Sequence, residues 1–343
     1  MKKLLIIGGG AIGRAYLPWV FPPDEFLYWY IDINEYISNR LRRPGGTTYM
    51  IQGSGYNVMK IKSQINPPVE FDAVLTAVGP RAFMGLVDMF INTRTPIICC
   101  ENDSRLPKRM SELTGNPNIY FAIPDVIASN TAPQRLKDID PLAIISENGI
   151  CYIDEAMKDL GGRAVYLDKE GMRREWMAKL YIHNTPHCIA AYMGYQKHAT
   201  LMSDALEDEE IRNTVWGAMN EMIGTIHTIY GIDKDFASQY AAKEIARFSN
   251  HLLHDPISRV AREPLRKLAK DDRLIGAAAL CLQAGGTPTN ILKGIRAAMR
   301  YIHPRDPDYR IMKRINKMSE FLGMMGISPD EPIYNTLMEE EKR

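Results

Sequence analysis

Lys179, Asn184 and His187 stand in an otherwise apolar helical stretch and have the types and spacing that a single ligand site needs. On an ideal α-helix, Asn184 lies about 140° and His187 about 80° around the axis from Lys179, so all three can share one broad face. Pro186 interrupts the stretch and should kink the helix, which would re-aim His187.

Such a set suits the oxidation of a secondary alcohol by hydride transfer. A lysine can take the hydroxyl proton if burial and a neighbouring cation lower its pKa toward neutrality. An asparagine amide can stabilise the developing alkoxide without titrating. The alternative is that these residues have no catalytic role, with the lysine exposed to solvent and the histidine hydrogen-bonded in the core. Without further support, the residues favour this alternative.

A glycine-rich motif near the start of the chain could hold the cofactor of such a reaction. An apolar run at residues 4–7 leads into Gly8-x-Gly10-x-x-Gly13 and then into a helical stretch. The first glycine permits a tight turn, the second lets the backbone approach a pyrophosphate, and the third allows the helix to pack closely on the strand. We expect this turn to contact a dinucleotide at the helix N-terminus through Gly8, Gly10, Ala11, Ile12 and Gly13.

Asp32 predicts which dinucleotide is bound. It ends a second apolar run, 19 residues after Gly13, where a carboxylate can accept hydrogen bonds from the adenosine ribose. The same carboxylate would repel a 2′-phosphate, and no arginine follows it directly, so the sequence favours NAD over NADP. The alternative is that Asp32 only caps the next helix.

The alternation of strands and helices predicts an α/β fold. Further apolar runs at residues 73–78 and 96–100 indicate a doubly wound parallel sheet of the Rossmann type. The first of these runs ends in a turn that should lie at the cofactor edge of the sheet. That turn comprises Thr76, Ala77, Val78 and Gly79.

The second half of the chain follows a helical pattern. Strand-like runs stop near residue 167, and the stretch from Ser203 to Gly231 predicts one long amphipathic helix. We therefore expect an NAD-binding domain at residues 1–170, followed by a mostly α-helical substrate and catalytic domain at residues 171–343.

Composition narrows the class of protein. The net charge is +1 and the pI is about 7.6, so we expect no nucleic-acid or membrane partner and a small molecule as the ligand. The five cysteines form no C-x-x-C pair, and they predict reduced, apolar fillers in a cytoplasmic protein without a metal site. No signal peptide or membrane span is predicted.

Several segments together resemble the polyol-specific long-chain dehydrogenases. Lys-x4-Asn-x2-His looks like the signature of this family, and the other similar segments follow in the expected order along most of the chain. They are residues 8–14, 76–80, 100–102, 179–192, 259–268 and 272–274.

The resemblance implies a metal-independent, NAD-dependent dehydrogenase, and by likeness a monomer, with a Rossmann-type domain and a helical domain. It implies that Lys179 is the general acid/base, Asn184 an oxyanion donor and His187 a residue that orients the substrate hydroxyl. Asn102 is expected near the nicotinamide. In two places the chain departs from the pattern, because an arginine expected near Asp125 is missing and Pro186 stands where glycine is usual.

A dense basic set in the second half could bind a sugar phosphate. The set comprises Arg259, Arg262, Arg266, Lys267 and Arg273. The alternative is a solvated basic face paired with Glu263, Asp271 and Asp272, and the residues alone do not decide between them. The resemblance favours a phosphorylated polyol.

Three rival functions remain open at this point. They are a dehydrogenase of an unphosphorylated polyol or a hexuronate, an NAD-binding sensor without activity, and a zinc-dependent alcohol dehydrogenase. For the last, the adjacency of His187 and Cys188 is too little to make a zinc site.

Overall fold

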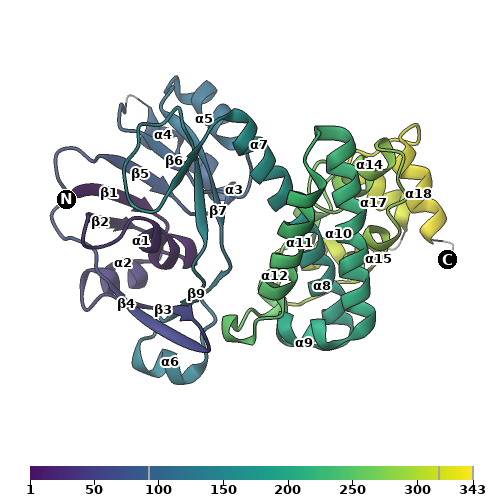
Figure 1. Cartoon of the computed structure of the whole chain (residues 1–343), viewed down its shortest axis with the longest axis horizontal. Coiled ribbons are helices and arrows are strands. Elements are labelled where there is room, and N and C mark those ends of the chain that lie inside the picture. The colour runs from purple at the N-terminus through teal and green to yellow at the C-terminus, as the bar shows by residue number, and fades with distance from the viewer. Residues whose placement is uncertain (92, 316, 342–343) are drawn as a thin grey trace. The chain divides into compact units, whose positions relative to one another are not determined.

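The computed structural model describes residues 1–91, 93–315 and 317–341, and the chain divides between Trp176 and Met177 (Figure 1). Unit 1 comprises Met1–Trp176 together with Leu252–His254. Unit 2 comprises Met177–His251 and the chain from Asp255 onward. The predicted second domain ends at residue 343, and its last two residues lie outside the described part.

A seven-stranded sheet forms the centre of unit 1, in the order β11-β10-β7-β6-β5-β1-β2. The five strands from β2 to β7 in this order are parallel, as predicted, whereas β10 pairs with β7 in the antiparallel direction. Because β11 pairs in parallel with β10, the parallel doubly wound sheet is confirmed with two reversed strands at one edge, a common variation in such sheets. The bounds are β1 (Lys2–Ile7), β2 (Phe26–Ile31), β5 (Ala73–Thr76), β6 (Ile97–Cys99), β7 (Ile119–Asp125), β10 (Ile150–Asp154) and β11 (Val165–Leu167).

A second sheet of four strands, β4-β3-β9-β8, was not predicted. Its main part is a hairpin in which β3 (Gly46–Gln52) pairs with β4 (Gly55–Ile61) across a two-residue turn that begins at Gly53, where φ is +57°. A two-residue turn containing glycine between β-branched and aromatic runs is the signal that would have indicated this hairpin. The remaining strands are β8 (Ala128–Ser129) and β9 (Ile144–Ser146).

Short helices connect the strands of unit 1. They are η1 (Ile12–Tyr16), α1 (Leu17–Val20), α2 (Glu35–Arg42), α3 (Pro80–Phe83), η2 (Met84–Leu86), α4 (Val87–Phe90), α5 (Leu106–Thr114), α6 (Gln134–Ile139) and α7 (Lys169–Met177). The helical stretch after the glycine turn begins with a π-helical turn, η1, and becomes α-helical at Leu17.

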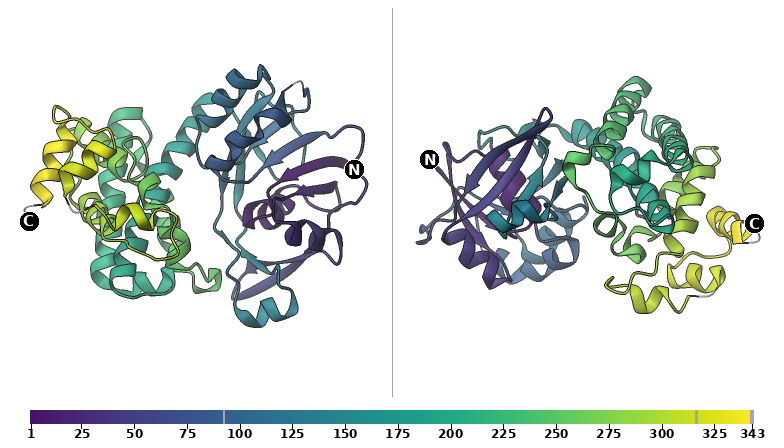
Figure 2. Two further views of the ribbon diagram at one scale, coloured as in Figure 1. Left: turned by 180° about the vertical axis from the view of Figure 1, so that it is seen from behind. Right: turned by 90° about the horizontal axis from the view of Figure 1, so that it is seen from below.

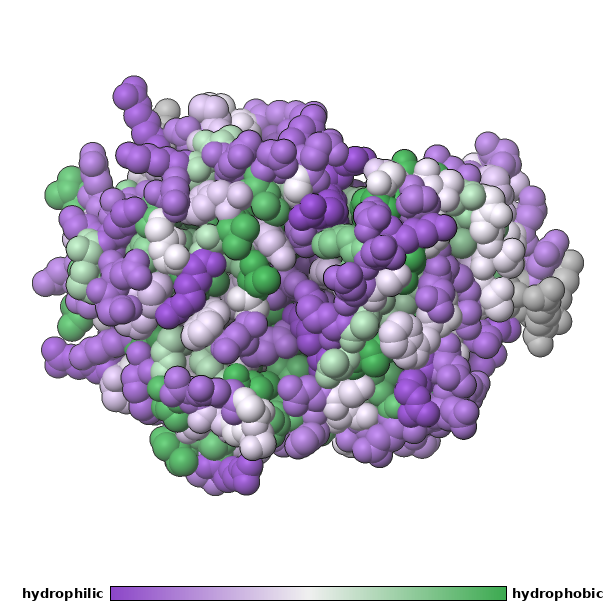
Figure 3. Space-filling view, in the orientation of Figure 1, coloured by the Kyte–Doolittle hydropathy of each residue, from purple (hydrophilic) through white to green (hydrophobic). Residues whose placement is uncertain are grey.

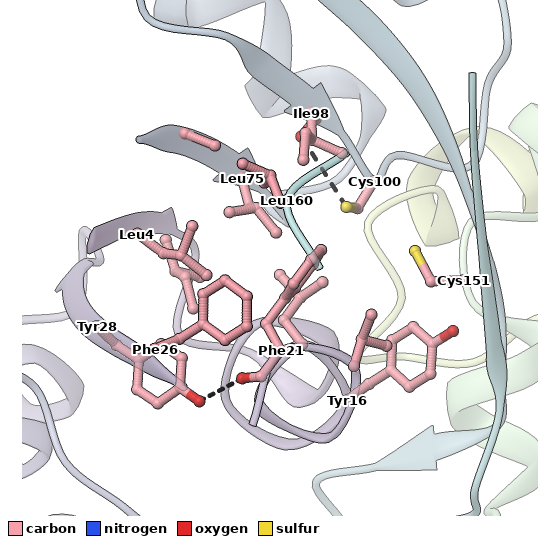
Figure 4. Packing of buried hydrophobic residues seen from close by; sticks show 14 of the residues in the cluster. Leu4, Tyr16, Phe21, Phe26, Tyr28, Leu75, Ile98, Cys100, Cys151 and Leu160 are labelled. Atoms are coloured by element: carbon pink, nitrogen blue, oxygen red, sulfur yellow. Dashed lines mark hydrogen bonds between the residues drawn. The ribbon is translucent and has the colours of Figure 1, made fainter. Parts of the chain in front are cut away.

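The largest core cluster of unit 1 is aromatic and aliphatic, and Cys100 and Cys151 belong to it (Figure 4). Cys100 and Cys151 pack with Leu75 and Leu160, while the Tyr28 hydroxyl donates a hydrogen bond to the Phe21 carbonyl. All five cysteines of the chain are buried and free, which agrees with their prediction as apolar fillers.

Unit 2 is a helical bundle, and Figure 2 shows it from two further sides. Helix α8 (Thr185–Gln196) is its central element, because residues 185–194 are all buried and the helix packs against α10, α12 and α15. The other helices are η3 (Ala178–Asn184), α9 (Met202–Glu207), α10 (Glu209–Tyr230), α11 (Lys234–Phe248), α12 (Ile257–Ala261), α13 (Pro264–Lys267), α14 (Ile275–Gln283), α15 (Thr289–Met299), α16 (Tyr309–Met312), α17 (Met318–Met324) and α18 (Pro332–Glu341). The short helix η4 (His251–Leu253) belongs partly to unit 1, which includes Leu252–His254.

The prediction of one helix from Ser203 to Gly231 is wrong at its start. The backbone of Asp208 is extended, with ψ at 124°, and its carboxylate accepts a hydrogen bond from the Ile211 N–H. Asp208 therefore caps a new helix, and the predicted element is divided into α9 and α10. Its predicted end is confirmed, because Gly231 closes α10 in the left-handed conformation.

Among the described residues, none of the helices combines the length and the apolarity that a membrane span requires. The face drawn in Figure 3 carries mostly hydrophilic residues, and its hydrophobic residues form small separate patches.

Candidate functional site

The parallel register of the sheet brings the predicted cofactor residues of unit 1 to one edge. Ile7 pairs with both Ile31 and Thr76, and Thr76 pairs with Cys99, so β1, β2, β5 and β6 end level with one another. The segments that follow these strands contain the glycine turn, Asp32, the turn after Thr76, and Asn102. Thr76 itself is fully buried, whereas Ala77, Val78, Gly79 and Asn102 are partly exposed.

The glycine turn has the geometry that the motif predicts. A Cβ on Gly8 would lie 2.4 Å from the Ala77 carbonyl oxygen, and one on Gly13 would lie 1.9 Å from the Gly8 carbonyl oxygen. Gly8 also has a φ of +103°, so both positions require glycine. A Cβ on Gly10 would meet nothing within 4 Å, so space for a phosphate is open at that position. Ala11 and Ile12, at the same turn, are partly exposed.

Asp32 supports the turn directly. One carboxylate oxygen accepts a hydrogen bond from the Gly9 N–H at 2.7 Å, and the other accepts one from the Asn34 N–H at 2.8 Å. Asn34, rather than Asp32, caps α2, because its side chain accepts a hydrogen bond from the Tyr36 N–H. Each carboxylate oxygen keeps a further lone pair that could accept a ribose hydroxyl.

Glu101 is a site residue to which sequence reasoning gave no role. Its two carboxylate oxygens accept hydrogen bonds from the Val78 N–H at 2.9 Å and the Gly79 N–H at 2.7 Å. Burial raises the pKa of this carboxyl, while the two backbone hydrogen bonds act in the opposite direction. Glu101 therefore holds the turn after β5 in place. Its position beside Asn102, directly after a buried strand, was the available signal.

The predicted catalytic residues of unit 2 are all buried, on η3 and the first turn of α8. Lys179, Asn184 and His187 are each less than 10% exposed. The segment Ala178–Asn184 is a π-helix, in which hydrogen bonds join residues five apart, so Lys179 and Asn184 become neighbours along one face. An ideal α-helix would hold them about 140° apart. The π-helix is followed by the α-helix α8, which begins at Thr185. Pro186 comes next and has no N–H, so it cannot donate the hydrogen bond that would extend the α-helical pattern into the preceding turn.

His187 lies against a buried carboxylate. Its Nε2 lies 3.3 Å from Asp255 Oδ2, and its ring stacks on Phe248 with the ring centres 4.5 Å apart. Asp255 in turn accepts two hydrogen bonds from Arg259, at 2.6 and 2.8 Å. Burial lowers the pKa of His187 to about 4 despite Asp255, so the imidazole is neutral at pH 7.

A second histidine lies beside this group and was not assigned by sequence reasoning. His183 Nδ1 forms a hydrogen bond with Glu244, a fully buried carboxylate that also accepts a hydrogen bond from Arg247. The rings of His183 and His187 lie 5.1 Å apart. Their spacing of four residues on a helix was the available signal.

The basic set divides into two groups. Arg259 binds Asp255 with both arms of its guanidinium, and the exposed Arg262 lies 3.7 Å from Glu263, so these two fit the ion-paired alternative. Pro264 begins the separate helix α13, as predicted, and therefore Arg262 and Arg266 do not share one helix.

The other three cations gather near α8. Arg273 and Lys267 are both buried and face Cys188, the neighbour of His187, while Arg266 lies between Glu263 and Asp272. Burial, with help from the two arginines, lowers the pKa of Lys267 to about 7. The Nη2 atom of Arg273 is buried without a hydrogen-bond partner in the described residues.

Comparison with known proteins matches residues 175–341 to the mannitol dehydrogenase C-terminal domain. The C-terminal half of the chain is therefore similar to the mannitol dehydrogenase family. This confirms the resemblance found in the sequence, and relatives extend the likeness to the N-terminal half. Mannitol-1-phosphate 5-dehydrogenase of Bacillus pumilus strain SAFR-032 is 29% identical, over 99% of this chain and 100% of that protein. The enzyme of that name from Podospora anserina is 26% identical, over 100% of this chain and 96% of that protein.

The fold of the mannitol dehydrogenase family also recurs among solved structures. The mannitol 2-dehydrogenase of Pseudomonas fluorescens, in a ternary complex with NAD and D-mannitol, matches with a TM-score of 0.74 and 13% identity. The match covers 99% of this chain and 90% of that chain. This likeness confirms the predicted fold class.

Proposed function

We propose that the protein is an NAD-dependent dehydrogenase that interconverts D-mannitol 1-phosphate and D-fructose 6-phosphate. The observation that supports the proposal is the buried π-helical segment Ala178–Asn184, which contains Lys179 and Asn184 five residues apart, in a chain similar along its whole length to enzymes named for this reaction. A general base beside an uncharged hydrogen-bond donor is what the oxidation of a secondary alcohol requires.

The residues of unit 1 fit the cofactor. Gly8, Gly10 and Gly13, with Ala11 and Ile12, form a turn that is open at Gly10, and Asp32 is available to a ribose hydroxyl. The turn Ala77–Val78–Gly79, held by Glu101, and Asn102 would contact the nicotinamide end. Bound NAD supplies the acceptor for the hydride that leaves the alcohol carbon.

The residues of unit 2 act on the substrate. Lys179 takes the proton of the substrate hydroxyl during oxidation and returns it during reduction. Asn184 donates a hydrogen bond to the oxygen as negative charge develops on it. His187, neutral at pH 7 and supported by Asp255, orients that hydroxyl.

Arg266, Lys267 and Arg273 are the candidates to bind the substrate phosphate. Arg273 Nη2 has no described partner, and a buried donor in that condition favours an anion or a water. The specific observation for a second candidate, an unphosphorylated polyol, is that the basic set is largely paired with acids. We further propose a cytoplasmic, monomeric and metal-independent enzyme without a nucleic-acid partner.

The test is oxidation of NADH by the purified protein without added metal, with fructose 6-phosphate and with fructose, for the wild type and Lys179→Ala. We expect turnover with the phosphate and a loss of at least about 100-fold in kcat in the variant. Turnover with fructose alone would indicate that the protein is a dehydrogenase of an unphosphorylated polyol. Binding of NADH without turnover on either sugar would overturn the proposal in favour of a hexuronate enzyme or a cofactor sensor.

A further inference from the structure

A cavity of about 320 Å³ lies in unit 1 at the C-terminal end of α2, where the start of β3, the end of β4 and the end of α6 meet (Figure 1). Its volume is at the lower end of the range of small-molecule sites, about 300–1,000 Å³. None of the residues that we assign to NAD is among the described residues of its lining. The cavity therefore requires its own explanation.

Three cations line the cavity. Lys60 belongs to β4 and Lys62 follows the last residue of this strand, Ile61, and both line the cavity. Lys60 Nζ donates a hydrogen bond to Thr47 Oγ1 at 2.5 Å, and neither lysine forms an ion pair with a described residue. The third cation, Arg40, comes from the last turn of α2.

Arg40 has a donor that the protein leaves unused. Its Nη2 lies 3.4 Å from Asp140 Oδ1, but its Nε is buried and has no hydrogen-bond partner among the described residues. The carboxylate of Asp140 already accepts a hydrogen bond from the Leu142 N–H and faces Arg14 as well as Arg40. The lining therefore keeps a net positive charge and an unsatisfied guanidinium donor, and a buried donor calls for an acceptor.

Two of the backbone carbonyls at this end of α2 are already hydrogen-bonded. The carbonyls of Asn39 and Arg40 accept hydrogen bonds from the N–H groups of Arg43 and Gly45, so the negative end of the helix is partly satisfied. Gly45 has a φ of +108°, and a Cβ there would lie 2.5 Å from the Ile61 carbonyl oxygen. This part of the lining therefore has to remain without a side chain.

We propose that this pocket binds the phosphate group of a small metabolite, through Arg40, Lys60 and Lys62. A guanidinium and two ammonium groups are the donors that recognise phosphate oxygens in proteins. The inference does not depend on the proposed function, because the pocket is separate from the candidate substrate cations of unit 2.

The test is calorimetric titration of the whole protein with inorganic phosphate at low ionic strength, in the presence of saturating NADH so that the glycine turn is already occupied. If both sites exist, the wild type binds two phosphates, Lys62→Glu and Arg266→Gln each bind one, and the double variant binds none. Lys108→Glu is the matched control, because Lys108 is 86% exposed on α5 and makes the same charge change outside the pocket. Lys60→Gln removes a second pocket cation and should weaken the same site by at least about tenfold.

The outcomes separate the two proposals. Loss of the sole phosphate site in Arg266→Gln, with no effect of Lys62→Glu or Lys60→Gln, would overturn the pocket. Loss of the sole site in Lys62→Glu would support the pocket and count against a substrate phosphate at Arg266. A repeat with fructose 6-phosphate identifies the source of the phosphate group: tighter binding at the pocket than inorganic phosphate indicates a sugar phosphate, and equal binding indicates the free ion.

Discussion

At the scale of single residues, the site depends on buried carboxylates that each hold one functional group. Glu101 holds the turn after β5, Asp255 holds His187, and Glu244 holds His183. Burial makes these contacts strong and makes the loss of one partner costly, because the remaining polar group cannot turn to water. Substitutions of these carboxylates should therefore affect binding and stability together.

Replacement of Glu101 by Gln tests the role of this carboxylate in the turn. Glutamine has one acceptor oxygen, so either the Val78 or the Gly79 N–H loses its partner. We expect the dissociation constant of NADH to rise about tenfold and the free energy of unfolding to fall by about 1–3 kcal/mol. Fluorescence titration and urea denaturation measure the two effects. Glu112→Gln, at a 65% exposed side chain on α5, should change neither.

His187 predicts how stability depends on pH. Its pKa is about 4 in the folded protein and 6.5 in the reference state, so between these values the unfolded chain binds a proton that the folded protein lacks. Stability is therefore unaffected by this group above pH 6.5 and falls as the pH drops toward 4. At pH 5, this group lowers the free energy of unfolding by about 2 kcal/mol relative to pH 7.

Urea denaturation at pH 7 and pH 5 measures this loss in the wild type and in His187→Gln. The difference between the two pH values should shrink by about 2 kcal/mol in the variant. It should stay unchanged in His251→Gln, which replaces an exposed histidine. An equal pH dependence in all three proteins would show that His187 is not the group responsible.

At the scale of elements, the site depends on η3 and α8. The π-helical turn brings Lys179 toward Asn184, and the α-helix that follows carries His187 into the centre of unit 2. Because α8 is enclosed by α10, α12 and α15, its position is determined by the fit between helices. Small residues at these contacts should matter more than the helix propensity of α8 itself.

Gly294 on α15 is such a contact. A Cβ there would lie 2.3 Å from Ile189 Cγ1, two residues from His187, and 3.2 Å from Ile189 Cβ. We expect Gly294→Ala to force α15 away from α8 and to lower the free energy of unfolding by about 1–3 kcal/mol. Gly224→Ala on α10 is the matched control, because its Cβ would meet nothing within 4 Å.

The control substitution should change the stability of the protein in the opposite direction. Alanine favours a helix interior over glycine by about 0.5–1 kcal/mol, so Gly224→Ala should raise the midpoint of urea denaturation while Gly294→Ala lowers it. If both variants were stabilised, the close packing of α15 on α8 would be refuted.

At the scale of the whole molecule, the two units have separate chemical tasks in the proposed reaction. Unit 1 presents the dinucleotide residues, and unit 2 presents the base, the oxyanion donor and the orienting histidine. Because the proposed mechanism takes proton transfer from Lys179 and charge stabilisation from Asn184, it requires no Lewis acid.

Metal removal tests this division of roles. Dialysis of the whole enzyme against EDTA should leave kcat and KM within about twofold of the untreated protein, because no proposed step uses a metal. Activity is measured with NADH and fructose 6-phosphate before and after dialysis. Loss of activity that is restored by zinc would contradict the proposal, and His183 with Glu244 would be the first ligands to test by substitution.

Local patterns in the sequence predicted much of both units. The glycine turn, the parallel strands, Asp32 and the helical second half were all identified from period and turn chemistry, which depend on neighbours along the chain. The hairpin β3–β4 was missed because its strands alternate weakly, with residues 46–50 all buried. The break at Asp208 was missed because the acidic residues there were interpreted as the first turn of one helix. The same residues also fit the start of a second helix, and the sequence does not distinguish the two cases.

The residue types of the proposed site can be recognised along the chain, since Lys179, Asn184 and His187 form a local signature. The groups that contact them follow from the folding of distant segments onto one another. Asp255 lies 68 residues from His187 and Glu244 lies 61 residues from His183, so no local period reports these pairs. Folding also determines which cations are neutralised. Arg259 is paired with Asp255, whereas Arg273 contacts Asp272 and keeps one buried donor, Nη2, without a described partner. Charge pairing depends on distance in space, and the sequence specifies only distance along the chain.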